Sequence, residues 1–157
     1  MKRLIILAVS AAAFMTIAPL SASAGPAGKS QARVIGPVVL NGDGTATVRA
    51  RYICQESDHL WVSAKQMADT RPDPRLQEEG SSALAANWMQ SHPDGSTFTC
   101  DGQWHTGSWV IETTDFGPLA PDWGPLERGQ AWVQFCLLTA TNENEFIVHN
   151  RWAAVVR

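Results

Sequence analysis

Hydrophobic and polar residues alternate along several stretches of the chain, most cleanly between Thr45 and Cys54. The polar positions of this stretch are threonine or arginine, including Arg49 and Arg51. A period of two that includes β-branched and aromatic residues is typical of a half-buried β-strand. The residues expected on its buried face are Ala46, Val48, Ala50, Tyr52 and Cys54.

The same period predicts two further strands whose outer faces carry aromatic and polar side chains. One spans residues 60–65 and the other spans residues 130–139. The inward sets are Leu60, Val62 and Ala64, and Ala131, Val133, Phe135 and Leu137. The outward sets are Trp61, Ser63 and Lys65, and Trp132, Gln134, Cys136 and Leu138.

The remaining segments are predicted as strands, turns and loops. Strands are expected over 32–40, bent or edge-placed at Gly36-Pro37, and over 145–157. Residues 97–100 and 103–113, on either side of an Asp101-Gly102 turn, are expected to form two strands or one bent strand. Turns are expected at Asn41-Gly42-Asp43-Gly44 and 142–144, and loops over 69–79 and 116–129. Residues 81–90 fit either a short helix capped by Ser81 or Ser82, or an irregular edge strand. Short alternating strands favour an all-β antiparallel sandwich of about seven strands, with little or no helix.

The first 24 residues have the pattern of a signal peptide. Lys2 and Arg3 precede an apolar run over 4–17, and Ala22-Ser23-Ala24 provides small residues for cleavage. The run is too short for a stable transmembrane helix, and the residue after the expected cut is glycine, which disfavours a lipid anchor. We therefore expect a signal peptide over 1–24, a flexible tail over 25–31 and one secreted, extracellular domain over 32–157.

Charge and length describe a mildly acidic single domain. The chain has 12 basic and 15 acidic residues and a net charge of −3, which becomes −5 once Lys2 and Arg3 are removed with the signal peptide. The charges are scattered, so no basic surface for nucleic acid or an anionic membrane is expected. After signal removal the chain has no second long apolar run, so no membrane insertion is expected either.

Three cysteines remain in the exported part, and cysteines outside the cytosol are expected to pair. Cys54 and Cys100 each end a strand-like run, whereas Cys136 lies within an apolar run. We therefore expect a Cys54–Cys100 disulfide and a free, mostly buried thiol at Cys136. An intermolecular disulfide through Cys136 is the alternative, although an unpaired cysteine is usually a small buried hydrophobic residue.

The chain resembles a group of small secreted actinobacterial domains of unknown function that have an immunoglobulin-like β-sandwich. The resemblance covers essentially the whole exported part. The matching residues are Tyr52-Ile53-Cys54, Leu60-Trp61-Val62-Ser63, Thr99-Cys100-Asp101-Gly102, His105-Thr106, Trp109, and Leu126-Glu127-Arg128-Gly129-Gln130-Ala131-Trp132-Val133. It implies the immunoglobulin-like fold and the Cys54–Cys100 bridge, and it implies no activity. The third cysteine and the stretches 69–90 and 116–125 depart from the family pattern, and an inward tryptophan on the third strand and a tyrosine corner are not evident.

No recognised catalytic or metal-binding motif occurs in the sequence. Gly28-Lys29-Ser30 lacks the spacing of a phosphate-binding loop, and the Asn41–Gly44 turn lacks the ligands of a calcium loop. The four histidines lie far apart in the sequence, and Ser108 would face away from His105 on a strand. Asp101 and Glu112 could serve as glycosidase carboxylates only if the fold brought them together. We expect no cofactor, no metal and no catalytic residue.

Seven tryptophans are the most distinctive part of the composition. Most are expected in the core or anchoring loops, but Trp61 and Trp132 are predicted on the outer face of neighbouring strands. We call Trp61, Lys65, Trp132 and Gln134 the tryptophan face, and we predict that it binds a protein, a glycan or a small apolar ligand. The alternative is that an insertion such as residues 81–90 covers this face.

These observations favour a non-enzymatic, secreted interaction or ligand-binding module. A carbohydrate- or cell-wall-binding module that uses Trp61 and Trp132 is the first alternative. A small extracellular hydrolase is the second, because catalytic residues can assemble from distant positions. A weaker analogy is to secreted actinobacterial immunoglobulin-like proteins that carry an apolar natural product, whose cysteine arrangement differs.

Overall fold

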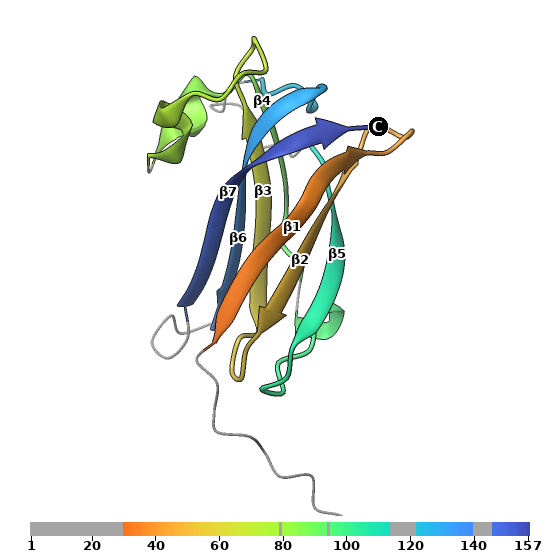
Figure 1. Ribbon diagram of the computed structural model, residues 1–157, viewed down its shortest axis with the longest axis vertical. Coiled ribbons are helices and arrows are strands. Elements are labelled where there is room, and N and C mark those ends of the chain that lie inside the picture. The colour runs from red at the N-terminus through yellow and green to blue at the C-terminus, as the bar shows by residue number, and fades with distance from the viewer. Residues whose placement is uncertain (1–29, 79, 94, 114–121, 140–145) are drawn as a thin grey trace, which may run out of the picture.

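Seven strands form one mixed β-sheet in the computed structural model, which describes residues 30–78, 80–93, 95–113, 122–139 and 146–157 (Figure 1). The order across the sheet is β4-β3-β6-β7-β1-β2-β5. The strands are β1 (Gln31–Leu40), β2 (Ala46–Ile53), β3 (His59–Gln66), β4 (Asn87–Ser91), β5 (His105–Ile111), β6 (Gly129–Leu138) and β7 (Phe146–Val156). The signal peptide expected over 1–24, most of the tail over 25–31 and the turn over 142–144 lie outside the described residues.

Strand β1 connects the two halves of the sheet. It pairs with β2 on both sides of a register shift between Ile35 and Val39, and near its end it also pairs with β7. Gly36 has a φ of 69°, a left-handed value that favours glycine and produces the bend predicted at Gly36-Pro37. The β1–β7 pairing is parallel, so the prediction of a purely antiparallel sheet is wrong at this pair. The reason is that the last strand returns beside the first in the same direction.

The sheet curls until its two edge strands meet. Gln90 of β4 and Glu112, directly after β5, form a bridge in which each backbone N–H donates to the other residue's carbonyl, at 2.9 and 3.1 Å. Inside the curl, Trp109 of β5 packs on Phe135 of β6 with ring centroids 5.1 Å apart. The inward sets predicted for β2, β3 and β6 are all buried in this core. The alternating pattern therefore predicted the core correctly.

The stretch before β5 differs from the predicted strand over 97–100. Residues Gly95–Thr97 form a short 3₁₀ turn, and the strand proper begins at His105. The backbone of Thr99 donates to the Tyr52 hydroxyl (3.2 Å), and Gly102 donates to the carbonyl of Cys54 (2.9 Å). These groups bond to a side chain and to the end of β2, so no neighbouring strand is needed to satisfy them.

The predicted disulfide joins this stretch to the end of β2. Cys54 and Cys100 are bonded, with their Cα atoms 4.7 Å apart. Cys136 is the free cysteine among the described residues, and it is buried. Both predictions about the cysteines are confirmed, and the burial of Cys136 argues against an intermolecular disulfide through its thiol.

A segment between β3 and β4 covers part of the outer face of the sheet. We call residues 67–78 and 80–85 the covering segment; it contains the 3₁₀ turns η1 (Pro74–Gln77) and η2 (Ser81–Leu84) and extends from one end of the sheet (Figure 1). The predicted alternatives for residues 81–90 are each correct in part, because the segment begins with a short 3₁₀ turn and ends in the edge strand β4.

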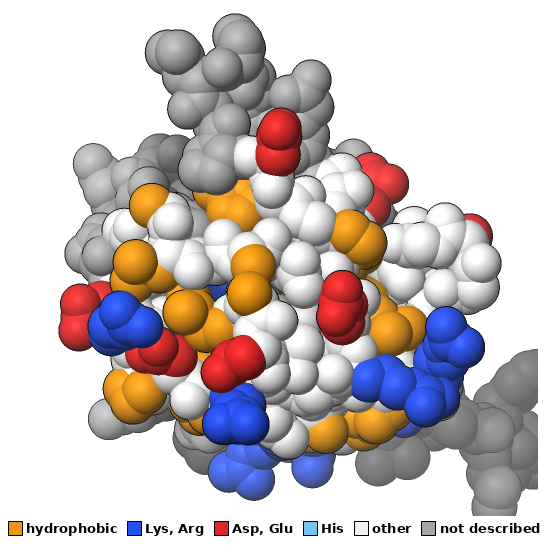
Figure 2. All heavy atoms as spheres, turned by 90° about the horizontal axis from the view of Figure 1, so that it is seen from above, with side chains coloured by type: hydrophobic (Ala, Val, Ile, Leu, Met, Phe, Trp, Pro, Cys, Tyr) orange, Lys and Arg blue, Asp and Glu red, His pale blue; other side chains and the backbone are white. Residues whose placement is uncertain are grey.

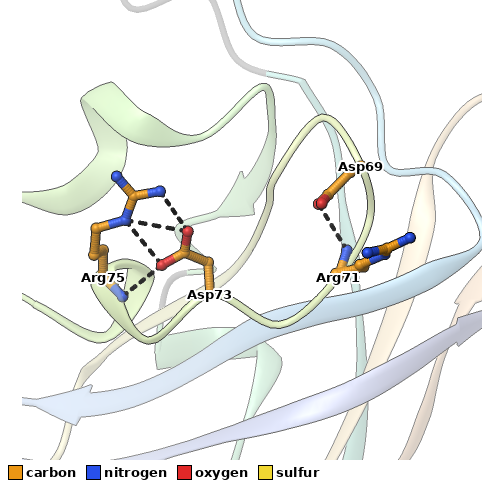
Figure 3. A network of polar contacts seen from close by, with 4 residues as sticks. All are labelled: Asp69, Arg71, Asp73 and Arg75. Carbon is orange, nitrogen blue, oxygen red and sulfur yellow. Dashed lines mark hydrogen bonds and ion pairs between the residues drawn. The ribbon is translucent and has the colours of Figure 1, made fainter.

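Local polar contacts shape the covering segment. The Asp73 carboxylate accepts from the backbone and the guanidinium of Arg75, while the Asp69 carboxylate accepts from the backbone of Arg71 (Figure 3). Hydrogen bonds from Arg75 lower the pKa of Asp73 to about 2. Thr70 accepts from the backbone N–H of Gln130 at 2.8 Å, which fastens the segment to the start of β6.

Candidate ligand-binding site

The four residues of the tryptophan face lie on the outer side of β3 and β6, as the alternation predicts. These strands are antiparallel neighbours, with Lys65 opposite Trp132 and Trp61 opposite Cys136. Gln134 lies between these two pairs, opposite Ser63. The sequence pattern therefore correctly placed these four side chains on one face.

An open cavity of about 560 Å³ lies on this face, and three of the four predicted residues line it. Its walls come from β3, β6, β7, β4 and the covering segment. The lining residues are Trp61, Lys65, Gln77, Glu78, Gly80, Trp88, Gln134, Cys136, Phe146, Val148 and Asn150. We call it the outer cavity. Its volume falls in the usual range for small-molecule sites.

Trp132 lies outside this cavity, which corrects the prediction that both tryptophans are exposed. Only 9% of its surface is accessible, because Leu76 and Ala85 of the covering segment pack over it. On its other side Trp152 of β7 approaches to 5.4 Å between ring centroids. The predicted alternative, in which an insertion covers the face, thus holds for its Trp132 end.

Lys65 is buried at the base of the outer cavity, although it was predicted as part of a polar rim. Only 5% of the residue's surface is exposed, and its Nζ donates to the Ser81 hydroxyl at 2.9 Å. Ser81 in turn donates to the carbonyl of Leu76 at 2.9 Å. No described carboxylate lies within ion-pair distance of this ammonium. Burial lowers the pKa of Lys65, because the charged form loses its hydration.

Trp61 forms the aromatic wall at the other end of the cavity. Its ring is half-buried, and Nε1 donates to the side-chain oxygen of Gln90 at 3.0 Å. The His92 ring stacks on it with an interplanar angle of 11° and centroids 6.3 Å apart. These two contacts fix the orientation of the indole, so an aromatic wall is present before any ligand binds.

Two oxygens between these ends have no hydrogen-bond partner among the described residues. They are Gln134 Oε1 and Ser63 Oγ, and both atoms are buried. Leaving such an atom unpaired costs about 1 to 3 kcal/mol. Gln134 lines the cavity, so one of these two unpaired oxygens belongs to a residue of the cavity wall.

Cys136 contributes a thiol to the same cavity. The residue is 4% exposed, and burial raises the pKa of its thiol to about 11. Because the thiolate is the nucleophilic form, this cysteine is unreactive at neutral pH.

The other sequence candidates do not converge. Asp101 precedes β5 and Glu112 follows it, so the strand holds the two carboxylates roughly 20 Å apart. Ser108 faces away from His105, which instead bonds Asp101 at 2.8 Å. Within the described ranges no three potential metal ligands cluster. The Asn41–Gly44 segment forms the predicted turn, closed by a bond from Asn41 N–H to the Thr45 carbonyl (2.8 Å).

Several residues of the outer cavity were not predicted. Glu78 and Trp88 line it from the covering segment and β4, and Asn150 lines it from β7. Ser81 does not line the cavity but bonds Lys65, which does. No local pattern marks them, because the contact between Ser81 and Lys65 spans 16 residues of sequence. The composition gave only the general signal that tryptophans are abundant.

In the part of the chain that the structure describes, no helix is both long and apolar enough to span a membrane. No protein-family model matches the sequence, and no curated protein is significantly similar to it.

Proposed function

We propose that this protein is an exported, non-enzymatic module that binds a small ligand in the outer cavity. The observation that supports this proposal is Lys65, a buried lysine that lines an open cavity and bonds only a neutral hydroxyl among the described residues. A buried ammonium is costly unless it is paired. A ligand with an apolar body and a carboxylate end would pair with it and fill the space between Trp61 and Trp88.

Export and an immunoglobulin-like sandwich are part of the same proposal. The N-terminal pattern over 1–24 supports export, and a disulfide is typical of proteins in oxidising compartments. Packing of Trp109 and Tyr52 from one half of the curled sheet on Phe135 from the other supports a sandwich. The resemblance to secreted actinobacterial immunoglobulin-like domains supports both.

Titration of tryptophan fluorescence tests the proposed function. The probes are alkyl and aryl carboxylates, each compared with its uncharged primary amide. We expect a saturable change with the carboxylates, a weaker one with the amides, and loss of the preference in Lys65→Met. Arg71→Gln, which changes an exposed side chain outside the cavity lining, should retain the response. A flat response to every probe would contradict ligand binding in this cavity.

A carbohydrate- or cell-wall-binding module remains the first alternative. Its support is the fixed, half-exposed ring of Trp61, because sugars stack on such rings. It predicts that neutral oligosaccharides or peptidoglycan fragments saturate the same fluorescence change, and that Trp61→Ala removes it while Lys65→Met does not.

A small extracellular hydrolase is the second alternative. It would require a nucleophile activated by a nearby base, and the thiol in the outer cavity has its pKa raised instead of lowered. Turnover of ester, peptide or glycan substrates that is lost in Cys136→Ser would favour the hydrolase over the binding module.

A further inference from the structure

A second concave surface lies where β1 separates from β7. The two strands pair only at Val38 and Val39, and toward the start of β1 they diverge (Figure 1). A cavity of about 540 Å³ lies beside this part of β1, with walls from β1, β2, the stretch before β5 and β7. We call it the seam groove. Its lining residues are Gln31, Ala32, Arg33, Ile35, Arg51, Trp104 and His149, and it shares none of them with the outer cavity.

The charge of the seam groove is positive. Arg33 and Arg51 occupy directly opposite positions of the β1–β2 ladder. Like charges placed opposite each other destabilise a sheet. Neither guanidinium has an ion-pair partner among the described residues, and the groove lining contains no acidic residue. An anion that bridged both guanidinium groups would relieve this repulsion.

An aromatic ring lies beside these charges. Trp104 is 45% exposed, and the guanidinium carbon of Arg51 lies 4.5 Å from the centre of its ring. This contact holds the charge and the ring together before binding. The arrangement suits a ligand that has an anionic group next to a flat or ring-shaped body.

His149 adds a neutral donor to the groove. Its Nδ1 accepts from the backbone N–H of Val34 at 3.1 Å, so the ring proton is on Nε2. Burial, together with the charges of Arg151 and Arg33, lowers the pKa of His149. The ring is therefore neutral at neutral pH, with one N–H available to a hydroxyl or carboxylate oxygen.

We propose that the seam groove binds an acidic glycan, with sugar carboxylates paired to Arg33 and Arg51 and a sugar ring against Trp104. Guanidinium groups bind carboxylates through two parallel hydrogen bonds, and exposed tryptophan rings pack on sugar rings. Nucleic acid fits less well, because its binding requires an extended basic surface and this chain is acidic overall, with a net charge of −3. The proposal does not depend on the function proposed for the outer cavity.

Calorimetric titration of the full chain tests this proposal. The probes are hexagalacturonate, neutral maltohexaose and a thymidine hexanucleotide, each at low and at physiological ionic strength. We expect hexagalacturonate to bind more tightly than either control, with an affinity that falls as salt is added. The double variant Arg33→Gln/Arg51→Gln should weaken binding by about tenfold or more, because two charge-assisted contacts are lost.

Control variants separate this site from other effects. Arg71→Gln removes an exposed arginine of the covering segment and should leave the affinity unchanged. The double variant should remain folded by circular dichroism, because its side chains are exposed and their repulsion is removed. The proposal is overturned if hexagalacturonate does not bind, if the double variant binds it equally well, or if the oligonucleotide binds as tightly.

Discussion

Burial gives Lys65 a chemistry that an ordinary surface lysine does not have. Its ammonium donates a hydrogen bond to the neutral hydroxyl of Ser81 in the covering segment. The interaction with Ser81 replaces only part of the hydration that the ammonium loses. The alternating pattern places Lys65 on the correct face of its strand, but only the covering segment turns that position into a buried one.

The cost of this burial makes stability depend on pH. The pKa of Lys65 is lowered from its ordinary value of 10.5, so the folded protein loses this proton at a lower pH than the unfolded chain does. The penalty is therefore complete at pH values below the lowered pKa and shrinks as the pH rises from there toward 10.5. We expect Lys65→Met to be more stable than the wild type at neutral pH, by a margin that narrows in alkaline solution. Urea unfolding at neutral and at alkaline pH measures the difference in the free energy of unfolding between Lys65→Met and the wild type, with Arg71→Met as control. A margin that is independent of pH would contradict this account.

Truncation of Trp61 and of Trp132, the two tryptophans of the tryptophan face, should lower stability by different amounts. Trp132 is buried between Leu76 and Trp152, so Trp132→Ala should lower the free energy of unfolding by about 3 kcal/mol or more. Trp61 is half-exposed, and Trp61→Ala should cost about 1 kcal/mol, chiefly through its hydrogen bond to Gln90. Urea denaturation followed by circular dichroism gives both values. Equal losses for the two variants would show that Trp61 is also a core residue.

At the scale of elements, periodicity predicts strands well and connections poorly. β2 and β6 were predicted within two residues at each end, because one face of each is entirely apolar. The strand expected over 97–100 is absent, because the Thr99 N–H bonds the Tyr52 hydroxyl and the nearby Gly102 N–H bonds the Cys54 carbonyl. Those partners are distant in sequence, so no local pattern contains them.

Gly129 controls how the covering segment joins β6. Its φ is 151°, and a Cβ added there would lie 2.5 Å from the Thr70 side chain and 2.7 Å from the Thr70 carbonyl oxygen. Gly129→Ala should therefore lower stability by about 1 to 3 kcal/mol. It should also speed hydrogen exchange at the Gln130 amide, which bonds that carbonyl.

Gly42→Ala is the matched control for this substitution. A Cβ at Gly42 would have no atom within 4 Å, so stability and exchange at Gln130 should remain unchanged. If Gly129→Ala behaves like Gly42→Ala, the tight contact with Thr70 does not hold the covering segment in place.

At the scale of the whole molecule, the curl of the sheet protects its edges. The bridge between Gln90 and Glu112 satisfies backbone groups that exposed edge strands would otherwise offer to other chains. On the end-on surface of Figure 2, acidic and basic side chains lie interspersed among apolar atoms. On this face, charges of one sign do not gather into a single continuous patch.

Removing one hydrogen bond of the bridge should loosen both edges. Glu112→Pro lacks the N–H that donates to the Gln90 carbonyl, whereas Glu112→Gln keeps it. We expect faster hydrogen exchange at the Gln90 amide and along β4 in Glu112→Pro, and wild-type exchange in Glu112→Gln. Unchanged exchange in the proline variant would mean that the edges are held together by side-chain packing alone.

The sequence by itself determined the strands with one apolar face, the partners in the disulfide and the grouping of Trp61, Lys65, Trp132 and Gln134 on one face. Each of these follows from local periodicity or from the position of cysteines at strand ends. Which part of that face remains open was decided by tertiary structure. The covering segment packs Leu76 on Trp132 and buries Lys65, and these contacts join residues that are distant in sequence. The parallel β1–β7 pairing and the seam groove beside it also depend on tertiary structure. The bend in β1 at Gly36 can be predicted locally, but its pairing with β7 joins strands from opposite ends of the domain.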